Sequence, residues 1–222
     1  MKLFYSSASP YVRKVVVTAI EAGLDSEIER ETPSSSVWIA NGDAEVSDKN
    51  PLGKIPTLIT RDGDALIDST LICEYLASLV PDAGLLPPNG RDRWKVRRLE
   101  ALAQGALDAI MLRNVETLFR PENLRSEDYV ARQNTKMDRT FDFFEAEIDH
   151  DGAQPLPGKP VNLGTITLGV TLAYLTQRFG DESWRNNRPV LSHWQDEFAR
   201  RDSMQATVPP SLPPAHLDPR QN

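Results

Sequence analysis

Apolar residues near the start of the chain change from a short continuous run to helical spacing. Residues 2–5 form a run rich in strand formers. Downstream, apolar residues recur at the spacing of one helix face: they are Val12, Val15, Val16, Ala19 and Ile20. Gly23 then offers a left-handed stop. The pattern predicts a strand over residues 2–5 and a helix that begins at Pro10.

Three further strands are predicted in the next part of the chain. One covers residues 28–32, and the polar stretch 33–50 that follows has no sustained periodicity, which is typical of a loop with one helical turn. The runs 55–60 and 65–67 flank Asp62-Gly63, a strong hairpin signal. These two runs are therefore expected to pair as antiparallel strands.

A second long helix is predicted directly after the hairpin. Asp68, Ser69 and Thr70 are possible caps, and apolar residues at helical spacing continue until Pro81. The order of elements so far is β-α-β followed by β-β-α. From residue 81 to residue 89 the composition shifts to proline, glycine and aspartate, which indicates a connecting segment.

The remainder of the chain is predicted to be helical. Four helices are indicated by apolar residues at helical spacing: Trp94, Leu99, Leu102, Ala106, Ile110 and Val115; then Val130, Met137, Phe141, Phe144 and Ile148; then Leu163, Ile166, Leu168, Val170, Leu172 and Leu175; then Val190, Leu191, Trp194 and Phe198. The third is apolar nearly all round, as expected for the centre of a bundle.

The end of the chain is rich in proline. We expect a disordered or extended tail there, because hardly any apolar pattern accompanies these prolines. The expected division is a first domain at residues 1–80, a linker at 81–89, an all-helical domain at 90–205 and a tail at 206–222.

Composition limits the possible partners. The chain has 222 residues, 40% of them hydrophobic, and a net charge of −7 that argues against nucleic acid. The most basic stretch, residues 91–98, is interpreted as a solvated helix face. No apolar run is long enough for a membrane span, and no signal peptide is recognised, so we expect a cytoplasmic protein with no membrane partner.

Metal and disulfide chemistry have no support in the sequence. The single cysteine, Cys73, excludes an intrachain disulfide, and we expect it to pack inside its helix. His150, His193 and His216 lie far apart and lack ligand spacing. We therefore expect no bound metal.

The loop Ser6-Ser7-Ala8-Ser9-Pro10-Tyr11 is the strongest candidate for chemistry. Ser9 is a good N-cap residue, and Pro10 suits the first helical position. At a helix start several N–H groups lack intrahelical partners and the macrodipole is positive. A thiolate, carboxylate or phosphate is therefore stabilised there.

Several motifs together resemble cytosolic glutathione S-transferases. The order of elements resembles a thioredoxin fold, with Ser6-x-x-Ser9 where that fold has Cys-x-x-Cys. The segment Asn50-Pro51-Leu52-Gly53-Lys54-Ile55-Pro56-Thr57-Leu58 resembles the family's N-P-x-G-K-[IV]-P-x-L, and Asp68-Ser69 resembles its [ED]-S pair. The resemblance covers residues 1 to about 205 and is greatest to bacterial serine-type members. It implies an α+β protein with an N-terminal thioredoxin-like α/β domain and a C-terminal all-α bundle.

The resemblance also implies a role for each motif. Ser9, with Ser6 and Ser7 as alternates, would hold the glutathione sulfur as a thiolate. Pro56 would follow a cis peptide, so that Ile55 shows its backbone to the cysteinyl part of glutathione. Asp68 and Ser69 would receive the γ-glutamyl group, and Lys54 would face the glycyl carboxylate. Glutathione is then a co-substrate, no cofactor is needed, and a small hydrophobic electrophile, a homodimer and a role in detoxification are implied.

Two other functions stay open. One is glutathione-dependent thiol or disulfide reduction, against which the serine argues because dithiol cycling needs thiols. The other is a binding or stress-response module with little turnover.

Two smaller features of the helical half also carry expectations. Asn162-Leu-Gly-Thr165 stands where the family has a capping box ending in Asp, which puts local stability in doubt. Gln104 and Asp108 lie on one helix face and could reach across a dimer to glutathione, but we expect a solvent-facing pair.

Overall fold

A four-stranded mixed sheet organises the first part of the chain. The computed structural model describes residues 1–35, 42–150, 161–180 and 183–209. The strands are β1 (Lys2–Phe4), β2 (Glu29–Glu31), β3 (Thr57–Ile59) and β4 (Ala65–Ile67). They lie in the order β2-β1-β3-β4, with β1 parallel to β2 and β3 antiparallel to both β1 and β4. All four predicted strands are confirmed; the first three are shorter than predicted, and β4 has the predicted bounds.

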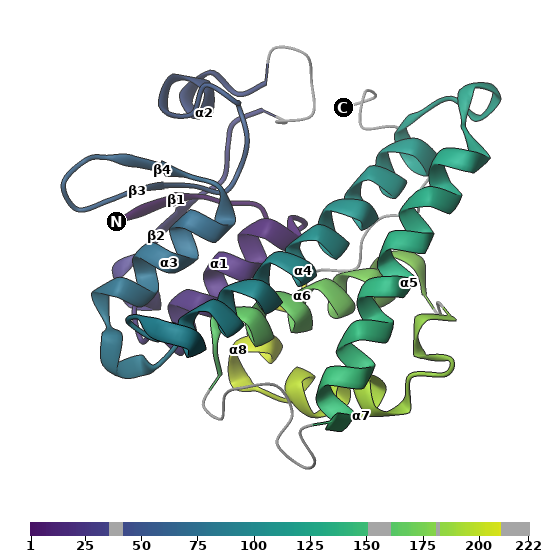
Figure 1. Ribbon diagram of the computed structural model, residues 1–222. Helices are drawn as coiled ribbons and strands as arrows, with labels where there is room; N and C mark the ends of the chain where they lie inside the picture. Colours follow the sequence, from purple (N-terminus) through teal and green to yellow (C-terminus); the bar gives the residue numbers. More distant parts are fainter. Residues whose placement is uncertain (36–41, 151–160, 181–182, 210–222) are drawn as a thin grey trace.

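Helices cover both faces of this sheet. They are α1 (Pro10–Glu21), α2 (Ala44–Lys49) and α3 (Ser69–Leu79). Figure 1 shows α1 and α3 together on one face and α2 on the other. The helical turn expected within residues 33–50 is α2, and the Asp43 side chain caps it by accepting from the Val46 N–H at 3.1 Å.

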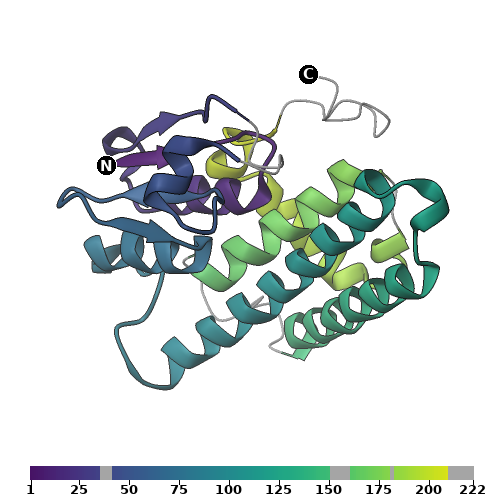
Figure 2. The same cartoon turned by 90° about the horizontal axis from the view of Figure 1, so that it is seen from above.

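The second part of the chain is helical throughout its described residues. It contains α4 (Gly90–Asn114), a π-helical continuation (Val115–Phe119), α5 (Glu127–His150), α6 (Leu163–Phe179), α7 (Pro189–Ala199) and the short α8 (Asp202–Gln205). Short 3-10 turns lie at Asp25–Glu27, Pro81–Ala83, Glu122–Leu124 and Ser183–Arg185. The chain thus has a thioredoxin-like sheet with helices followed by an all-helical region, as predicted (Figure 2).

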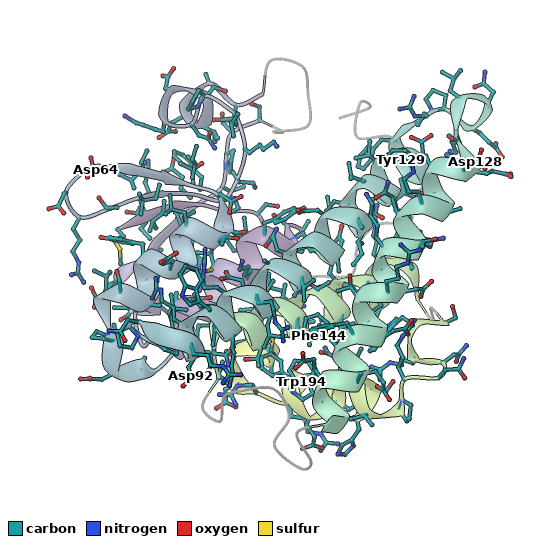
Figure 3. The ribbon with its side chains drawn as sticks, viewed as in Figure 1. Asp64, Asp92, Asp128, Tyr129, Phe144 and Trp194 are labelled. Atoms are coloured by element: carbon teal, nitrogen blue, oxygen red, sulfur yellow. The ribbon has the colours of Figure 1, made fainter. Side chains whose placement is uncertain are left out.

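The central position predicted for the third helix of this region is confirmed. Helix α6 packs against α4, α7 and α1, so it joins the helical bundle to the sheet domain. Most of its residues are buried, from Leu163 to Leu175. Helices α5 and α7 also pack against each other, and Phe144 of α5 and Trp194 of α7 (labelled in Figure 3) are both buried.

The start of α6 corrects one expectation. The Asn162 side chain accepts from the Thr165 N–H at 3.0 Å, and the Thr165 hydroxyl accepts from the Asn162 N–H at 3.0 Å. Both halves of a capping box are therefore present. Asn162 therefore caps the helix as expected, and a threonine hydroxyl supplies the acceptor for which an aspartate was expected, so the capping box is complete without a carboxylate.

The first turns of α4 correct two more expectations drawn from the sequence. Trp94, which the spacing placed among the apolar residues of the helix, is 71% exposed. Residues 91–98 are more than a solvated face, because Arg93 and Arg97 both pair with Glu74 of α3, and Arg98 pairs with Glu147 of α5 at 2.6 Å. Helical spacing does not reveal these partners, because they belong to other elements.

Helix α8 and the residues after it pack on the sheet domain. Helix α8, which the sequence did not predict, lies against α1. The Thr207 hydroxyl accepts from Arg13 Nε at 3.2 Å. From residue 210 on, the proline-rich segment lies outside the described residues. None of the described helices is long and apolar enough to cross a membrane.

Candidate functional site

Three candidate segments meet at one edge of the sheet. Phe4, at the end of β1, pairs with Thr57, and Thr57 pairs with Ile67 at the end of β4. The loop after β1, the segment before β3 and the residue after β4 therefore lie side by side. These positions carry Ser9, Pro56 and Asp68, so the fold brings together residues that are distant in sequence.

Ser9 begins α1 in the geometry expected of a cap. Its backbone is extended, with φ −87° and ψ 119°, and its Oγ accepts from the Val12 N–H at 3.3 Å. The side chain is half-buried. A hydroxyl that accepts in a cap keeps its own hydrogen for donation to another group. Ser9 thus combines a free O–H with the positive end of a twelve-residue helix.

Ser6 and Ser7 have different surroundings from Ser9. Ser6 Oγ accepts from the Ala8 N–H at 3.4 Å, and the Ser6 carbonyl accepts from the Ser9 N–H at 3.2 Å. Both side chains line a small pocket that also contains Arg13, whereas Ser9 is outside it. The structure therefore separates the three serines into one helix cap and two pocket residues.

The segment before β3 is held by a buried asparagine. The Ile55–Pro56 peptide is cis. Asn50, 1% exposed, donates from its amide to the Lys54 carbonyl at 2.8 Å and to the Thr57 hydroxyl at 3.0 Å. Ile55 is half-buried and precedes the paired residues of β3, while the Lys54 side chain is exposed. The sequence assigned no role to Asn50, and its two hydrogen bonds hold this turn in place.

The start of α3 combines backbone strain with an unpaired hydroxyl. Asp68 has φ +73°, a region that non-glycine residues rarely occupy, and its Oδ1 accepts from the Thr70 N–H at 2.8 Å. Ser69 is 2% exposed, and its Oγ has no hydrogen-bond partner among the described residues. Buried hydroxyls are normally bonded, so this one leaves hydrogen-bonding capacity unused.

Helix α4 reaches the same edge from the other domain, and sequence reasoning missed this. Tyr11 of α1 donates to Asp108 Oδ1 at 2.7 Å, and the Gln104 amide donates to the same oxygen at 3.2 Å. Gln104 also accepts from Lys14 Nζ at 3.2 Å. The pair is therefore a link between domains rather than a solvent-facing pair, although Asp108 itself stays exposed.

Lys14 is a buried cation beneath the start of α3. Its side chain is fully buried and pairs with Glu100 of α4, also buried, at 2.9 Å. It donates as well to the Thr70 hydroxyl at 3.2 Å. A single lysine among the valines of α1 was the sequence signal for this network.

Two titratable groups near the site stay protonated. Burial raises the pKa of Tyr11 far above its usual value, and the Asp108 carboxylate adds to the effect. Burial raises the pKa of the Cys73 thiol to about 11, and this sulfur accepts from the Thr18 hydroxyl at 3.2 Å. The predicted packing of Cys73 inside its helix is confirmed, since it is fully buried. No cluster of side chains suited to a metal ion occurs among the described residues.

Comparison with known proteins gives consistent matches. Residues 8–79 match the family model of the glutathione S-transferase N-terminal domain. The chain is 35% identical to the uncharacterized GST-like protein YibF of Escherichia coli K12, over 95% of this chain and 99% of that protein.

Solved structures match over nearly the whole chain. A glutathione transferase family member from Pseudomonas fluorescens Pf-5 with bound glutathione is 35% identical, with TM-score 0.85, over 94% of this chain and 98% of that one. A glutathione S-transferase from Methylobacillus flagellatus with glutathione bound is 34% identical, with TM-score 0.83, over 94% of this chain and 99% of that one.

Proposed function

This chain belongs to the glutathione S-transferase family, and on that premise we propose that it is a glutathione transferase of the serine type. It binds glutathione, holds the sulfur as a thiolate beside Ser9, and directs it at a small hydrophobic electrophile. One observation carries the proposal: a helix-capping hydroxyl, the segment before a cis proline and an unpaired buried hydroxyl converge at one sheet edge. The glutathione-bound relatives support the choice of ligand.

Each part of glutathione has a proposed partner at this edge. Ile55, just before the ladder of β3, pairs its backbone with the cysteinyl part as an added antiparallel strand. Ser69 Oγ and the first N–H groups of α3 receive the γ-glutamyl carboxylate, while the Asp68 carboxylate faces the ammonium group. The exposed Lys54 faces the glycyl carboxylate.

Ser9 acts on the equilibrium between thiol and thiolate. A lowering of the thiol pKa by about two units requires about 2.7 kcal/mol of differential stabilisation. One hydroxyl donor and a helix terminus together supply energies of this order. The thiol proton passes to solvent, and the thiolate forms a sulfur–carbon bond to the electrophile, which either releases a leaving group such as halide or, after addition to a double bond, takes up a proton from solvent. Lower basicity also lowers intrinsic nucleophilicity, so positioning of the two reactants provides much of the acceleration.

The electrophile is proposed to lie along α4 beyond Asp108. Leu112 and Val115 continue that side of the helix and are 43% and 37% exposed. Tyr11, held by Asp108, adds a protonated hydroxyl beside this apolar strip. The Tyr11 hydrogen is donated to Asp108, so the strip offers an apolar surface, which suits a hydrophobic electrophile.

The proposal extends to assembly and location. Leu52, Leu71 and Trp94 are exposed apolar side chains, at 65%, 47% and 71%, which favours burial in a homodimer. A cytoplasmic location and a role in detoxification complete the proposal. No observation favours the alternative of a glutathione-dependent reductase, because the single cysteine, Cys73, is buried and protonated.

A serine series tests the proposal. Wild type is expected to be retained by immobilised glutathione and to conjugate it to a generic aryl halide. Ser9→Ala is expected to remain bound but to lose about tenfold or more in kcat, because it removes the hydroxyl donor. Ser9→Thr, which keeps both hydroxyl and cap, is the matched control and retains most activity.

Each outcome of this series has a distinct meaning. Full activity of Ser9→Ala would refute the assigned role and direct attention to Ser6. Retention of wild type without any conjugation would show a binding module instead of an enzyme.

A further inference from the structure

A small polar pocket lies beside the serine loop and shares no lining residue with the proposed glutathione site. It has a volume of about 20 Å³, and its polar walls are Tyr5, Ser6, Ser7, Arg13, Arg30 and Thr207. Neither Ser9 nor Pro56 nor the start of α3 contributes to it. Its walls come from the end of β1, the first turns of α1, β2 and the segment after α8, which lies beside α1.

Arg13 is the unusual group in this pocket. It is only 8% exposed, yet no carboxylate pairs with it among the described residues. Its Nε donates to the Thr207 hydroxyl at 3.2 Å, and one terminal nitrogen donates to the Met204 carbonyl at 3.0 Å. These two bonds use two of the five N–H donors of a guanidinium.

Burial without a counter-ion is unfavourable for a cation. Desolvation lowers the pKa of Arg13 to about 10, which shows that its surroundings do not compensate the charge. Buried charges are normally paired. An anion in the pocket would therefore contact the Arg13 guanidinium, a partially desolvated cation that has unused N–H donors.

The remaining walls also favour an anion. Four hydroxyl groups and two guanidinium groups line the pocket, and no carboxylate does. Arg30 pairs with Asp25 and lies over the Tyr5 ring, 5.7 Å from its centroid, so the net positive charge belongs to Arg13. A volume of about 20 Å³ holds one water-sized atom.

We propose that this pocket is a binding site for a small oxyanion, which inserts one oxygen between Arg13 and the hydroxyls of Ser6 and Ser7. Phosphate, sulfate and carboxylate groups share this chemistry. Ser6 and Ser7 belong to the loop that leads into α1, so a bound oxyanion stabilises the conformation of that loop. The inference depends only on the pocket and does not require the proposed transferase activity.

Thermal unfolding with added anions tests the site. At constant ionic strength, inorganic phosphate, sulfate and acetate are titrated in separate arms, with chloride as the reference salt. The midpoint of wild type is expected to rise with a saturating dependence on at least one oxyanion, because a ligand of the native state stabilises it. The arms identify which of the three groups the pocket prefers.

Three variants locate the effect. Arg13→Gln is expected to weaken oxyanion binding at least tenfold, since it removes a charged donor. Ser7→Ala, an exposed wall residue with little structural cost, weakens binding by a smaller factor. Arg139→Gln removes an equal charge from the exposed side of α5 and leaves binding unchanged.

Several results would overturn the site. They are no response to any oxyanion, an equal response to chloride, or the same oxyanion dependence in wild type and Arg13→Gln. If Arg13→Gln does not fold, Ser7→Ala and Arg30→Gln decide, and unchanged affinity in both overturns the proposal.

Discussion

At the scale of single residues, the candidate site depends on side chains with unused hydrogen-bonding capacity. Ser9 accepts from the Val12 N–H and keeps its hydrogen, and Ser69 is buried with no partner among the described residues. Asp68 occupies a strained backbone region at the start of α3. Such features are costly in a free protein and become favourable when a ligand completes them.

One residue far from the sulfur gives a pH prediction. Hydrogen bonds from the Val46 N–H, the Ser34 hydroxyl and the Ser35 N–H lower the pKa of Asp43 to about 2. The unfolded value is about 3.9, so this carboxylate contributes stability above that pH and loses it as the pH falls toward 2. Acid unfolding should therefore be shallower for Asp43→Asn, whose amide oxygen still caps α2. Parallel acid transitions of the two proteins would contradict this assignment.

At the scale of elements, local signals predicted most of the fold. Local signals lie within or next to the structures that they specify: strand formers in the strands, Asp62-Gly63 in the hairpin and cap residues at the helix starts. These elements can therefore be predicted from a short stretch of sequence. Helix α8, four residues long, has too little periodicity to be recognised. The cap of α6 was misjudged because the expected aspartate is only one of several side chains that accept from the cap N–H.

The α6 cap has a measurable energy. Thr165→Val keeps the shape but leaves the buried Asn162 N–H without its acceptor, which is expected to cost about 1–3 kcal/mol in the free energy of unfolding. Thr167→Val is the matched control, because its hydroxyl only returns to the Leu163 carbonyl of the same helix. Urea denaturation should show a clearly larger loss for Thr165→Val. Equal losses would mean that the capping box adds nothing specific.

At the scale of the whole molecule, the two domains meet through polar groups that spacing alone did not reveal. Gln104 and Asp108 lie on one face of α4, as the sequence predicted, but their partners come from α1. Lys14 and Glu100 are 86 positions apart and pair in the interior. The sequence indicated the edge that would carry the site, whereas the domain interface needed three-dimensional placement.

The Lys14–Glu100 pair is expected to dominate the stability of the interface. Lys14→Met removes the fully buried one of the two cations that pair with Glu100, the other being Arg97 at 2.7 Å, and should lower the free energy of unfolding by up to about 3–5 kcal/mol. The double variant Lys14→Met/Glu100→Leu should recover much of that loss, because two apolar side chains replace two desolvated charges. A double-mutant cycle measured by urea denaturation gives the coupling. Additive losses would show that the two charges do not act as a pair.

The most direct test of the account is the pKa of the glutathione thiol in the bound state, followed by the ultraviolet absorbance of the thiolate as pH is varied. In wild type this pKa should lie about two units below the free value of about 8.5. Ser9→Thr should keep the lowered value, and Ser9→Ala should return it toward that of free glutathione. A bound thiol that titrates as it does in solution, or one that Ser9→Ala leaves unchanged, would contradict the central claim.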